Sequence, residues 1–291
     1  MFSGSFVALV TPFNQQGDID EDQYVSLIKW HIDKGTHGLV PCGTTGETPT
    51  LKLEEHKRLI ELCVKEVKGQ VPVIAGVGSN ATDKVIDLAQ YAEAQGADAV
   101  LVVTPYYNKP SQDGLYEHYN ALHSATNIPI VLYNVPSRTG VDLSIETIGK
   151  LAELPRIVGI KDASPDLSRP VLIRQVISRK DFCLLSGEDG TVAAYLAQGG
   201  DGCISVTANV APDLCAMLHD AWNNKDYAEF SELRDRLMPL HQVMFIEASP
   251  APAKYALSTL GLCSPHVRLP LLEASGMCRK RVDSTMSVVG I

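Results

Sequence analysis

Short apolar runs alternate along the chain with stretches of helical periodicity. Eight such runs have starts 21 to 33 residues apart, and each is rich in Val, Ile and Leu without alternating polar residues. Continuous apolar runs of this length are typical of strands that are buried on both faces, as in a parallel sheet. The predicted strands are Phe6–Val10, Leu39–Cys42, Val71–Val77, Ala99–Val103, Pro129–Tyr133, Ile157–Ile160, Phe182–Leu185 and Cys203–Val206.

The segments between these runs have the spacing of amphipathic helices. Positions i, i+3, i+4 and i+7 of the first such segment form one face, made by Tyr24, Leu27, Ile28 and His31. A later segment repeats the pattern with Leu88, Ala89 and Ala92. Glycines such as Gly35 and Gly96 follow these segments and predict helix ends, because glycine adopts the left-handed conformation of a helix terminus most easily.

Eight strand–helix units predict an α/β protein built as a (β/α)8 TIM barrel over residues 1–224. An open, doubly wound sheet is the alternative, but eight evenly spaced units favour closure of the sheet. Residues 225–291 show helical patterns over Tyr227–Phe245 and Ala251–Leu260. They predict a C-terminal helical appendage.

Composition and charge exclude several classes of function. The 291 residues carry a formal net charge of −9, which argues against a general nucleic-acid-binding protein with a basic face. No apolar run reaches the roughly 18 residues that suggest a membrane span, and the first basic residue is Lys29, which is unlike a signal peptide. The seven cysteines include no C-x-x-C pair, which predicts reduced, buried thiols in a cytoplasmic protein.

Polar residues directly follow the predicted strands, at the end of a barrel where active sites are found. Lys161 continues the strand Ile157–Ile160 without a polar break and shares a face with Gly159. If that face is the barrel interior, the ammonium lies above an apolar floor with a gap left by Gly159. Such desolvation favours the neutral amine, which is the nucleophilic form. The alternative is a structural ion pair between Lys161 and an acid at the barrel mouth.

Hydroxyl groups and one arginine accompany this lysine at the predicted strand ends. Tyr133 ends one strand, and Thr44 and Tyr107 follow two others. Three hydroxyls can form a chain that carries protons to and from water. Arg138 offers a forked donor for a carboxylate, while Thr44 and Thr45 lie between two glycines, where hydroxyls and backbone N–H groups can face an anion. The alternative for each aromatic residue is packing in the core or at an interface.

Motifs for other cofactors and for metals are weaker. Gly76–Ala81 matches G-x-G-x-x-A, but the nearest acid, Asp98, precedes the next strand instead of following it, which argues against a dinucleotide site. Acidic residues in Gly187–Gly190 and at Asp201 disfavour a phosphate site after the last two strands. The eight histidines form no H-E-x-x-H motif and no convincing ligand set, so we expect no metal.

Three motifs resemble those of the dihydrodipicolinate synthase family: G-T-T-G-E at 43–47, Y-N-V-P-S-R-T-G at 133–140 and V-G-I-K-D at 158–162. The resemblance runs from Gly4 to Leu240 and weakens over the remaining C-terminal residues. It implies a (β/α)8 barrel with a C-terminal helical domain, usually assembled as a homotetramer that is a dimer of dimers. It also implies a lyase that condenses pyruvate with L-aspartate 4-semialdehyde in lysine and diaminopimelate biosynthesis, without a cofactor.

The resemblance assigns catalytic roles. Lys161 matches the lysine that forms a Schiff base with the pyruvate ketone. Tyr133, Thr44 and Tyr107 match the family's proton relay, in which the residue at Tyr107 reaches across a tight dimer interface into the neighbouring site.

The resemblance also assigns binding roles. Thr45, with Thr44, matches residues that hold the pyruvate carboxylate, and Arg138 matches the arginine that receives the carboxylate of the semialdehyde. Gly187 and the backbone carbonyl of Ile204 match groups that line the pocket near the lysine.

Two other functions stay open. N-acetylneuraminate lyase, another pyruvate-dependent Schiff-base lyase, shares the lysine and tyrosine but is expected to lack an arginine in the loop that corresponds to Tyr133–Gly140, so Arg138 favours the synthase. A non-catalytic barrel that binds a keto acid would have no use for a desolvated lysine beside hydroxyl groups.

Members of the family that lysine inhibits carry an effector site at the dimer interface. The matching residues are Thr48, Pro49, Leu53, His56, Asn80, Lys84 and Tyr106. Sensitive members carry a glutamate in place of Lys84 and often a histidine in place of Leu53. A cation that faces the amines of lysine costs affinity, which predicts weak or absent inhibition. The alternative is that Lys84 turns to solvent and the site survives.

Overall fold

The computed structural model describes residues 2–291, which divide into two compact units. The central unit comprises residues 2–3 and Pro72–Ile204, and the terminal unit comprises Gly4–Val71 and Ser205–Ile291. The strands form one eight-stranded parallel sheet with helices between them, so the predicted (β/α)8 barrel is confirmed. The predicted boundary at residue 224 follows helix α9 (Pro212–Asn223) and stays a prediction.

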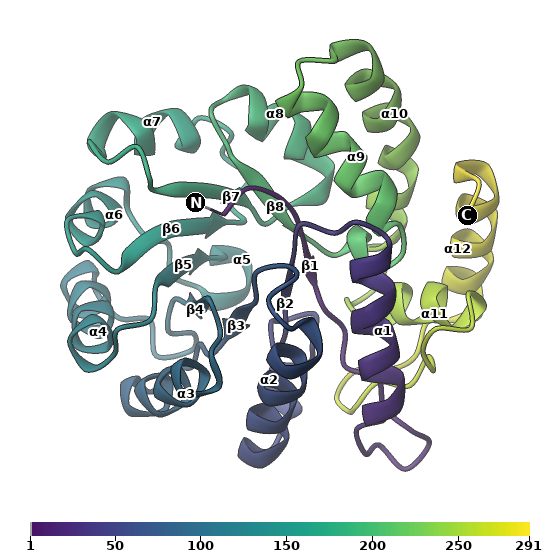
Figure 1. The fold of residues 1–291 in the computed structure, drawn as a ribbon, viewed down its shortest axis with the longest axis horizontal. Coiled ribbons are helices and arrows are strands. Elements are labelled where there is room, and N and C mark those ends of the chain that lie inside the picture. Colours follow the sequence, from purple (N-terminus) through teal and green to yellow (C-terminus); the bar gives the residue numbers. More distant parts are fainter. Residues whose placement is uncertain (1) are drawn as a thin grey trace. The chain divides into compact units, whose positions relative to one another are not determined.

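In the central unit, strands β3 to β8 pair with their neighbours in chain order. These strands are β3 (Ile74–Gly76), β4 (Ala99–Val103), β5 (Ile130–Asn134), β6 (Ile157–Asp162), β7 (Cys183–Ser186) and β8 (Gly202–Ser205). Its α-helices are α3 (Thr82–Gln95), α4 (Gln112–Ala125), α5 (Pro136–Thr139), α6 (Ile145–Ala152), α7 (Arg169–Val176) and α8 (Val192–Ala197). Figure 1 shows α3, α4, α6 and α7 along one side of this row of strands.

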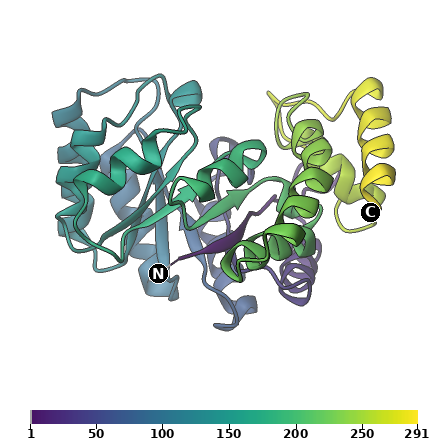
Figure 2. The ribbon, with the colours of Figure 1, turned by 90° about the horizontal axis from the view of Figure 1, so that it is seen from above.

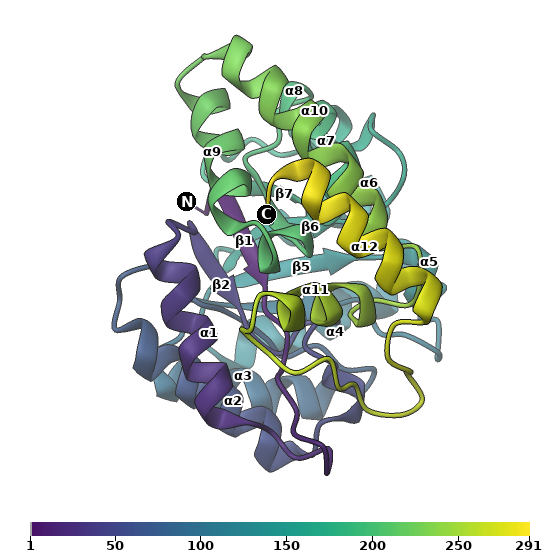
Figure 3. The same cartoon turned by 90° about the vertical axis from the view of Figure 1, so that its right-hand side faces the viewer.

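In the terminal unit, β1 (Gly4–Ala8) pairs in parallel with β2 (Gly38–Val40). Its α-helices are α1 (Glu21–Asp33), α2 (Leu53–Val67), α9, α10 (Tyr227–Val243), α11 (Ala251–Thr259) and α12 (Gly276–Val289). The helices predicted over Tyr227–Phe245 and Ala251–Leu260 are present as α10 and α11, and Figures 2 and 3 show α10 beside α12.

All eight predicted strands are present, with bounds that shift where an apolar run extends beyond the ladder. The run Val71–Val77 shortens to β3, because the N–H of Val73 bonds the carboxylate of Asp98 at 2.8 Å. Asp98 is the nearest acid to the glycine-rich motif, and this hydrogen bond engages the carboxylate that a dinucleotide site would need. Gly78 of the glycine-rich motif packs tightly, since a Cβ there would lie 2.6 Å from the nitrogen of Val103. The motif therefore serves packing between β3 and β4.

All seven cysteines are buried and none forms a disulfide, as the sequence predicts. Burial raises the pKa of Cys63 and of Cys183 to about 12, so both remain thiols at neutral pH and are unreactive. Among residues 2–291, no helix has the length and apolar character needed to cross a membrane.

Helix α1 shows how the sequence pattern becomes packing. Asp20 caps its first turn by accepting a hydrogen bond from the N–H of Gln23, and the predicted apolar face is buried. His31 completes that face with no exposed surface, and neither ring nitrogen has a hydrogen-bond partner in the described chain. Burial lowers the pKa of His31 to about 3, so the ring is neutral and its N–H group is unpaired.

We expect His31→Leu to stabilise the protein, and to do so more at acidic than at neutral pH. Because the pKa is about 6.5 in the unfolded chain and about 3 when folded, His31 destabilises the native state progressively as pH falls below about 6.5. At about pH 5 this cost approaches about 2 kcal/mol. Thermal midpoints at about pH 7.5 and about pH 5 measure the difference. A gain that does not grow at the lower pH contradicts this account of His31.

Candidate active site

The pairing of β5 with β6 places two predicted site residues side by side. Tyr133 lies opposite Lys161 in the parallel register, and Lys161 in turn lies opposite Leu185 of β7. Tyr133 and Lys161 are each only 7% exposed. Near its C-terminal end, each of these two strands therefore carries a long polar side chain into a mostly buried space.

The amine of Lys161 lies over an aromatic ring and forms no ion pair within the described residues. Its Nζ is 4.4 Å from the centre of the Tyr133 ring, and no Asp or Glu among residues 2–291 forms an ion pair with it. The alternative of a structural ion pair at the barrel mouth is therefore wrong. An unpaired, buried amine beside a phenol is suited to attack a carbonyl carbon, with the phenol available for proton transfer.

Two glycines shape the surroundings of Lys161. A Cβ at Gly187 would lie 3.0 Å from Cε of Lys161 and 2.6 Å from Cβ of Ala163, so only glycine leaves room for the lysine side chain. The expected gap at Gly159 is absent, because a Cβ there would lie 2.0 Å from Sγ of Cys183. That prediction was wrong because the side chain of the paired residue on β7 fills the space.

A carboxylate lies in the electrostatic field of Lys161. Burial raises the pKa of Glu188, which follows Gly187, and the neighbouring Asp189 raises it further, whereas Lys161 lowers it. The sequence shows this acid only as negative charge that disfavours phosphate. In the structure Glu188 is exposed to solvent and accepts a hydrogen bond from the N–H of Gly190 at 3.3 Å.

Other predicted residues of the central unit have defined places. Arg138 lies on the short helix α5, which closely follows β5, and it is exposed to solvent. Ile204 is buried in β8, with 1% of its surface exposed. Lys109, which the sequence did not single out, packs beside Gly140 at the end of α5, where a Cβ would lie 2.8 Å from its Cε.

Tyr107 is not brought to Lys161 within this chain. Its side chain is 89% exposed, which is incompatible with packing against the buried amine. The N–H of Asn108 donates to the carbonyl of Tyr106 at 2.9 Å, and Tyr107 between them has a φ of 72°. This tight turn is strained for a bulky side chain and directs the phenol outward.

In the terminal unit, Thr44 and Thr45 lie on a turn that follows β2. The N–H of Gly46 donates to the carbonyl of Gly43, and the hydroxyl of Thr11 fixes the carbonyl of Gly46 at 2.8 Å. Within residues 2–291 the hydroxyls of Thr44 and Thr45 form no hydrogen bond. A turn whose backbone is fixed by hydrogen bonds, and whose two hydroxyls form none, is suited to bind a carboxylate.

A buried ion pair fixes the end of this turn. Glu47 has a φ of 57°, and its Oε1 lies 2.6 Å from Nζ of Lys254 on α11. The N–H of Arg268 donates to Oε2 at 2.9 Å, and Lys254 also bonds the carbonyl of His266. Burial lowers the pKa of Lys254, although Glu47 opposes that shift. No local pattern could reveal this pair, because its members are 207 residues apart.

The effector-site residues are distributed over both units. In the terminal unit, Thr48 donates to the carbonyl of Gly43, Pro49 is exposed, Leu53 is 49% exposed at the start of α2, and His56 is buried. In the central unit, Lys84 is exposed on α3, and the carbonyl of Asn80 accepts a hydrogen bond from Asn108, two residues beyond Tyr106. Their role as an effector site stays a prediction.

Comparisons with known proteins identify the family. A sequence model of the Dihydrodipicolinate synthetase family matches residues 1–288. The chain belongs to this family. The 4-hydroxy-tetrahydrodipicolinate synthase of Rhodospirillum centenum is 55% identical over 291 residues, covering 100% of this chain and 99% of that protein. The same enzyme of Parvibaculum lavamentivorans is 54% identical with the same coverage.

A solved structure extends the comparison to three dimensions. The chloride-inhibited dihydrodipicolinate synthase of Acinetobacter baumannii, complexed with pyruvate, is 42% identical to this chain. It superposes with a TM-score of 0.97 and covers 100% of both chains. Family membership thus extends through the C-terminal helices, where the resemblance seen in the sequence motifs weakens.

No group of three or more His, Cys, Asp or Glu side chains within the described residues is arranged to hold a metal ion. In the central unit, the predicted site residues offer an amine, a phenol and a guanidinium group. These groups are suited to anionic carbonyl compounds, because they combine cationic and neutral donors with one nucleophile.

We expect Lys254→Met to lower the free energy of unfolding by about 3 to 5 kcal/mol, because it leaves the Glu47 carboxylate buried without its cation. The double variant Glu47→Leu with Lys254→Met removes both charges and should recover most of that loss. Urea unfolding of the wild type, both single variants and the double variant measures the coupling. Losses that simply add would contradict an interaction between the two side chains.

Proposed function

We propose that the chain condenses pyruvate with L-aspartate 4-semialdehyde, as a 4-hydroxy-tetrahydrodipicolinate synthase in lysine and diaminopimelate biosynthesis. The observation that carries the proposal is the unpaired, buried amine of Lys161 over the ring of Tyr133. Full-length relatives with more than half of their residues identical support it, as does the pyruvate complex of the Acinetobacter baumannii enzyme.

The first half of the reaction forms a covalent intermediate. The neutral amine of Lys161 attacks the ketone carbon of pyruvate, and loss of one water gives an iminium ion. The iminium withdraws electrons, so a methyl proton is lost and an enamine forms. Tyr133, beside the amine, transfers protons in these steps. The lysine imine is itself the electron sink, so the proposed mechanism uses no cofactor.

The second half forms a carbon–carbon bond and releases the enzyme. The enamine carbon attacks the aldehyde carbon, which becomes an alcohol as its oxygen gains a proton. The amino group of the same substrate then attacks the iminium carbon and displaces the amine of Lys161. The product is a hydroxylated ring, and Lys161 returns to its starting state.

Carboxylate recognition falls to separate groups. We propose that Thr44 and Thr45 bind the carboxylate of pyruvate with their unused hydroxyls. Gly187 lies against the lysine side chain, and we propose that the carbonyl of Ile204 lines the same pocket. Arg138 receives the carboxylate of the semialdehyde through its exposed guanidinium group.

Tyr107 completes the proton relay with Tyr133 and Thr44 only if it acts in a second copy of the chain. Its outward direction supports a tight dimer, and we propose a homotetramer of two such dimers in the cytoplasm. Lys84 in the matching effector site should make lysine a weak inhibitor or no inhibitor. A synthase assay in which sub-millimolar lysine inhibits strongly would contradict that expectation.

Pyruvate followed by borohydride should fix one reduced pyruvate on Lys161, because borohydride reduces an imine to a stable amine. Mapping the modified peptide by mass spectrometry locates the adduct. Lys161→Ala should abolish it. Lys150→Ala should not, because Lys150 is an exposed lysine paired with Glu146 on α6. An adduct that persists in Lys161→Ala would end the proposed mechanism.

Arg138→Ala should raise the KM for the semialdehyde by about 10- to 100-fold, the worth of a charged hydrogen bond. The rate of imine formation with pyruvate should change far less. Arg138→Lys keeps the charge without the fork and should be intermediate. Steady-state kinetics and borohydride trapping measure the two quantities, and an equal loss in both would refute the assigned role.

A further inference from the structure

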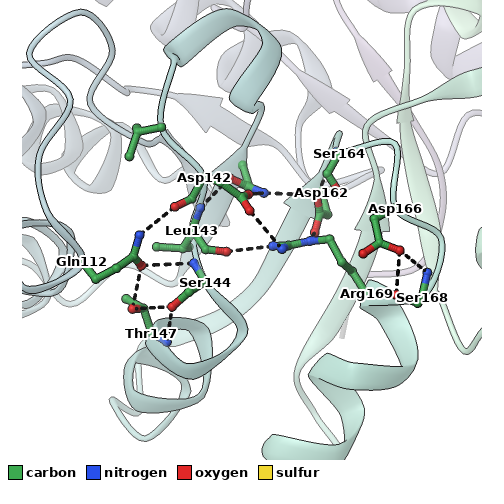
Figure 4. A network of polar contacts seen from close by, with 12 residues as sticks. Gln112, Asp142, Leu143, Ser144, Thr147, Asp162, Ser164, Asp166, Ser168 and Arg169 are labelled. Atoms are coloured by element: carbon green, nitrogen blue, oxygen red, sulfur yellow. Dashed lines mark hydrogen bonds and ion pairs between the residues drawn. The ribbon is translucent and has the colours of Figure 1, made fainter.

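Figure 4 shows a polar network that joins Asp142, Asp162 and Arg169. Two of its members lie one residue beyond Tyr133 and Lys161 in the paired strands β5 and β6. Asn134 follows Tyr133, Asp162 follows Lys161, and Asn134 and Asp162 are themselves paired in register. Successive side chains of a strand point to opposite faces, so Asn134 and Asp162 point away from the two candidate catalytic side chains. Their exposed fractions are 0% and 3%, so their polar atoms need partners within the protein.

Arg169, the first residue of α7, is the centre of this network. Its Nε donates to Oδ2 of Asp162 at 2.6 Å, and its Nη2 donates to the carbonyl of Leu143 at 2.8 Å. Its Nη1 lies 3.4 Å from Oδ2 of Asp142. One buried guanidinium thus joins the end of β6 to the segment between α5 and α6. The planar fork allows all three contacts to form at once.

The network also holds the end of β5. Nδ2 of Asn134 donates to Oδ1 of Asp142 at 2.7 Å, and Oδ1 of Asn134 accepts from the N–H of Leu143 at 3.0 Å. Nδ2 of Asn134 also reaches Oδ1 of Asp162 at 3.4 Å, and the N–H of Ser164 donates to that oxygen at 2.9 Å. The two strand ends are thereby tied to the same segment and to each other.

We propose that Arg169 is a positioning residue for imine formation, acting through Asp162 and Asn134 to hold Lys161 and Tyr133 at their mutual distance. This inference rests on the proposed function of Lys161. A shift of about 1 Å at a reacting group can cost about 100-fold in rate. The network fixes the backbone one residue beyond each reacting side chain, where such a shift would be transmitted directly.

The same helix provides a control for purely structural effects. Arg174 on α7 also combines an ion pair with carbonyl contacts, since its Nη2 lies 2.6 Å from Oδ2 of Asp201 and its Nη1 donates to the carbonyl of Phe182 at 2.7 Å. None of its partners is next to Lys161 or Tyr133 in the chain. Removing either arginine removes an ion pair and carbonyl contacts, from a side chain that is 7% exposed in Arg169 and 31% exposed in Arg174. Only Arg169 contacts the ends of the strands that carry Lys161 and Tyr133.

The test compares Arg169→Met, Arg169→Lys and Arg174→Met with the wild type, using full-length protein well below every thermal midpoint. Borohydride added at a series of times gives the rate at which the Lys161–pyruvate adduct forms. The final amount of adduct gives the fraction of protein molecules with a competent site. Rates are expressed per competent site, so partial unfolding does not mimic a slow reaction. We expect a loss of about 10- to 100-fold for Arg169→Met, partial recovery in Arg169→Lys and a change within about twofold for Arg174→Met.

Equal rates per competent site in Arg169→Met and Arg174→Met would overturn the positioning role, even if both variants lose stability. If Arg169→Met does not fold, the same comparison is made with Arg169→Lys, for which a rate equal to wild type would overturn it. The pH profile of the rate supplies a second readout, since misplacement of Tyr133 should alter it. Absence of any adduct in the wild type would refute the proposed function itself.

Discussion

The parallel register between β5 and β6 is the constraint on which the rest of the candidate site depends. It sets Tyr133 opposite Lys161 and, one residue later, Asn134 opposite Asp162. Because side chains alternate, one pairing supplies both a reactive face and a supporting face. A slip of β6 by one residue against β5 would turn the Lys161 amine into the layer of helices and bring the Asp162 carboxylate to the side of Tyr133.

The buried charged side chains differ in whether they form ion pairs, and the difference follows their proposed roles. Arg169 with Asp162, and Lys254 with Glu47, are paired inside the protein and satisfied by further hydrogen bonds. Lys161 is also buried, with 7% of its surface exposed, but forms no ion pair in the described chain. An acid paired with this amine would occupy it and hinder its attack on a carbonyl. A chain of net charge −9 can thus act on anionic substrates with a few directed donors instead of a basic surface.

The fold was largely predictable because each strand is a continuous apolar run and each run is a local signal. Lys161, Tyr133 and Arg138 were also predictable, since they follow apolar runs directly or match a contiguous motif. The partners of Glu47 and Asp162 were not, because tertiary packing alone brings Lys254 and Arg169 to them. The filling of the space at Gly159 escaped prediction for the same reason, since Cys183 comes from another strand. The periodicity of the sequence predicts which face of a strand a side chain lies on, but not which side chain of the neighbouring strand it contacts.

The most direct test of the central claim is a crystal structure of the protein after reaction with pyruvate. The account predicts continuous density from Nζ of Lys161 to the former ketone carbon, with the Tyr133 hydroxyl within hydrogen-bond distance of the adduct. The N–H groups and carbonyls behind β5 and β6 should keep their present partners. Pyruvate bound non-covalently beside a free Lys161, or joined to another residue, would contradict it.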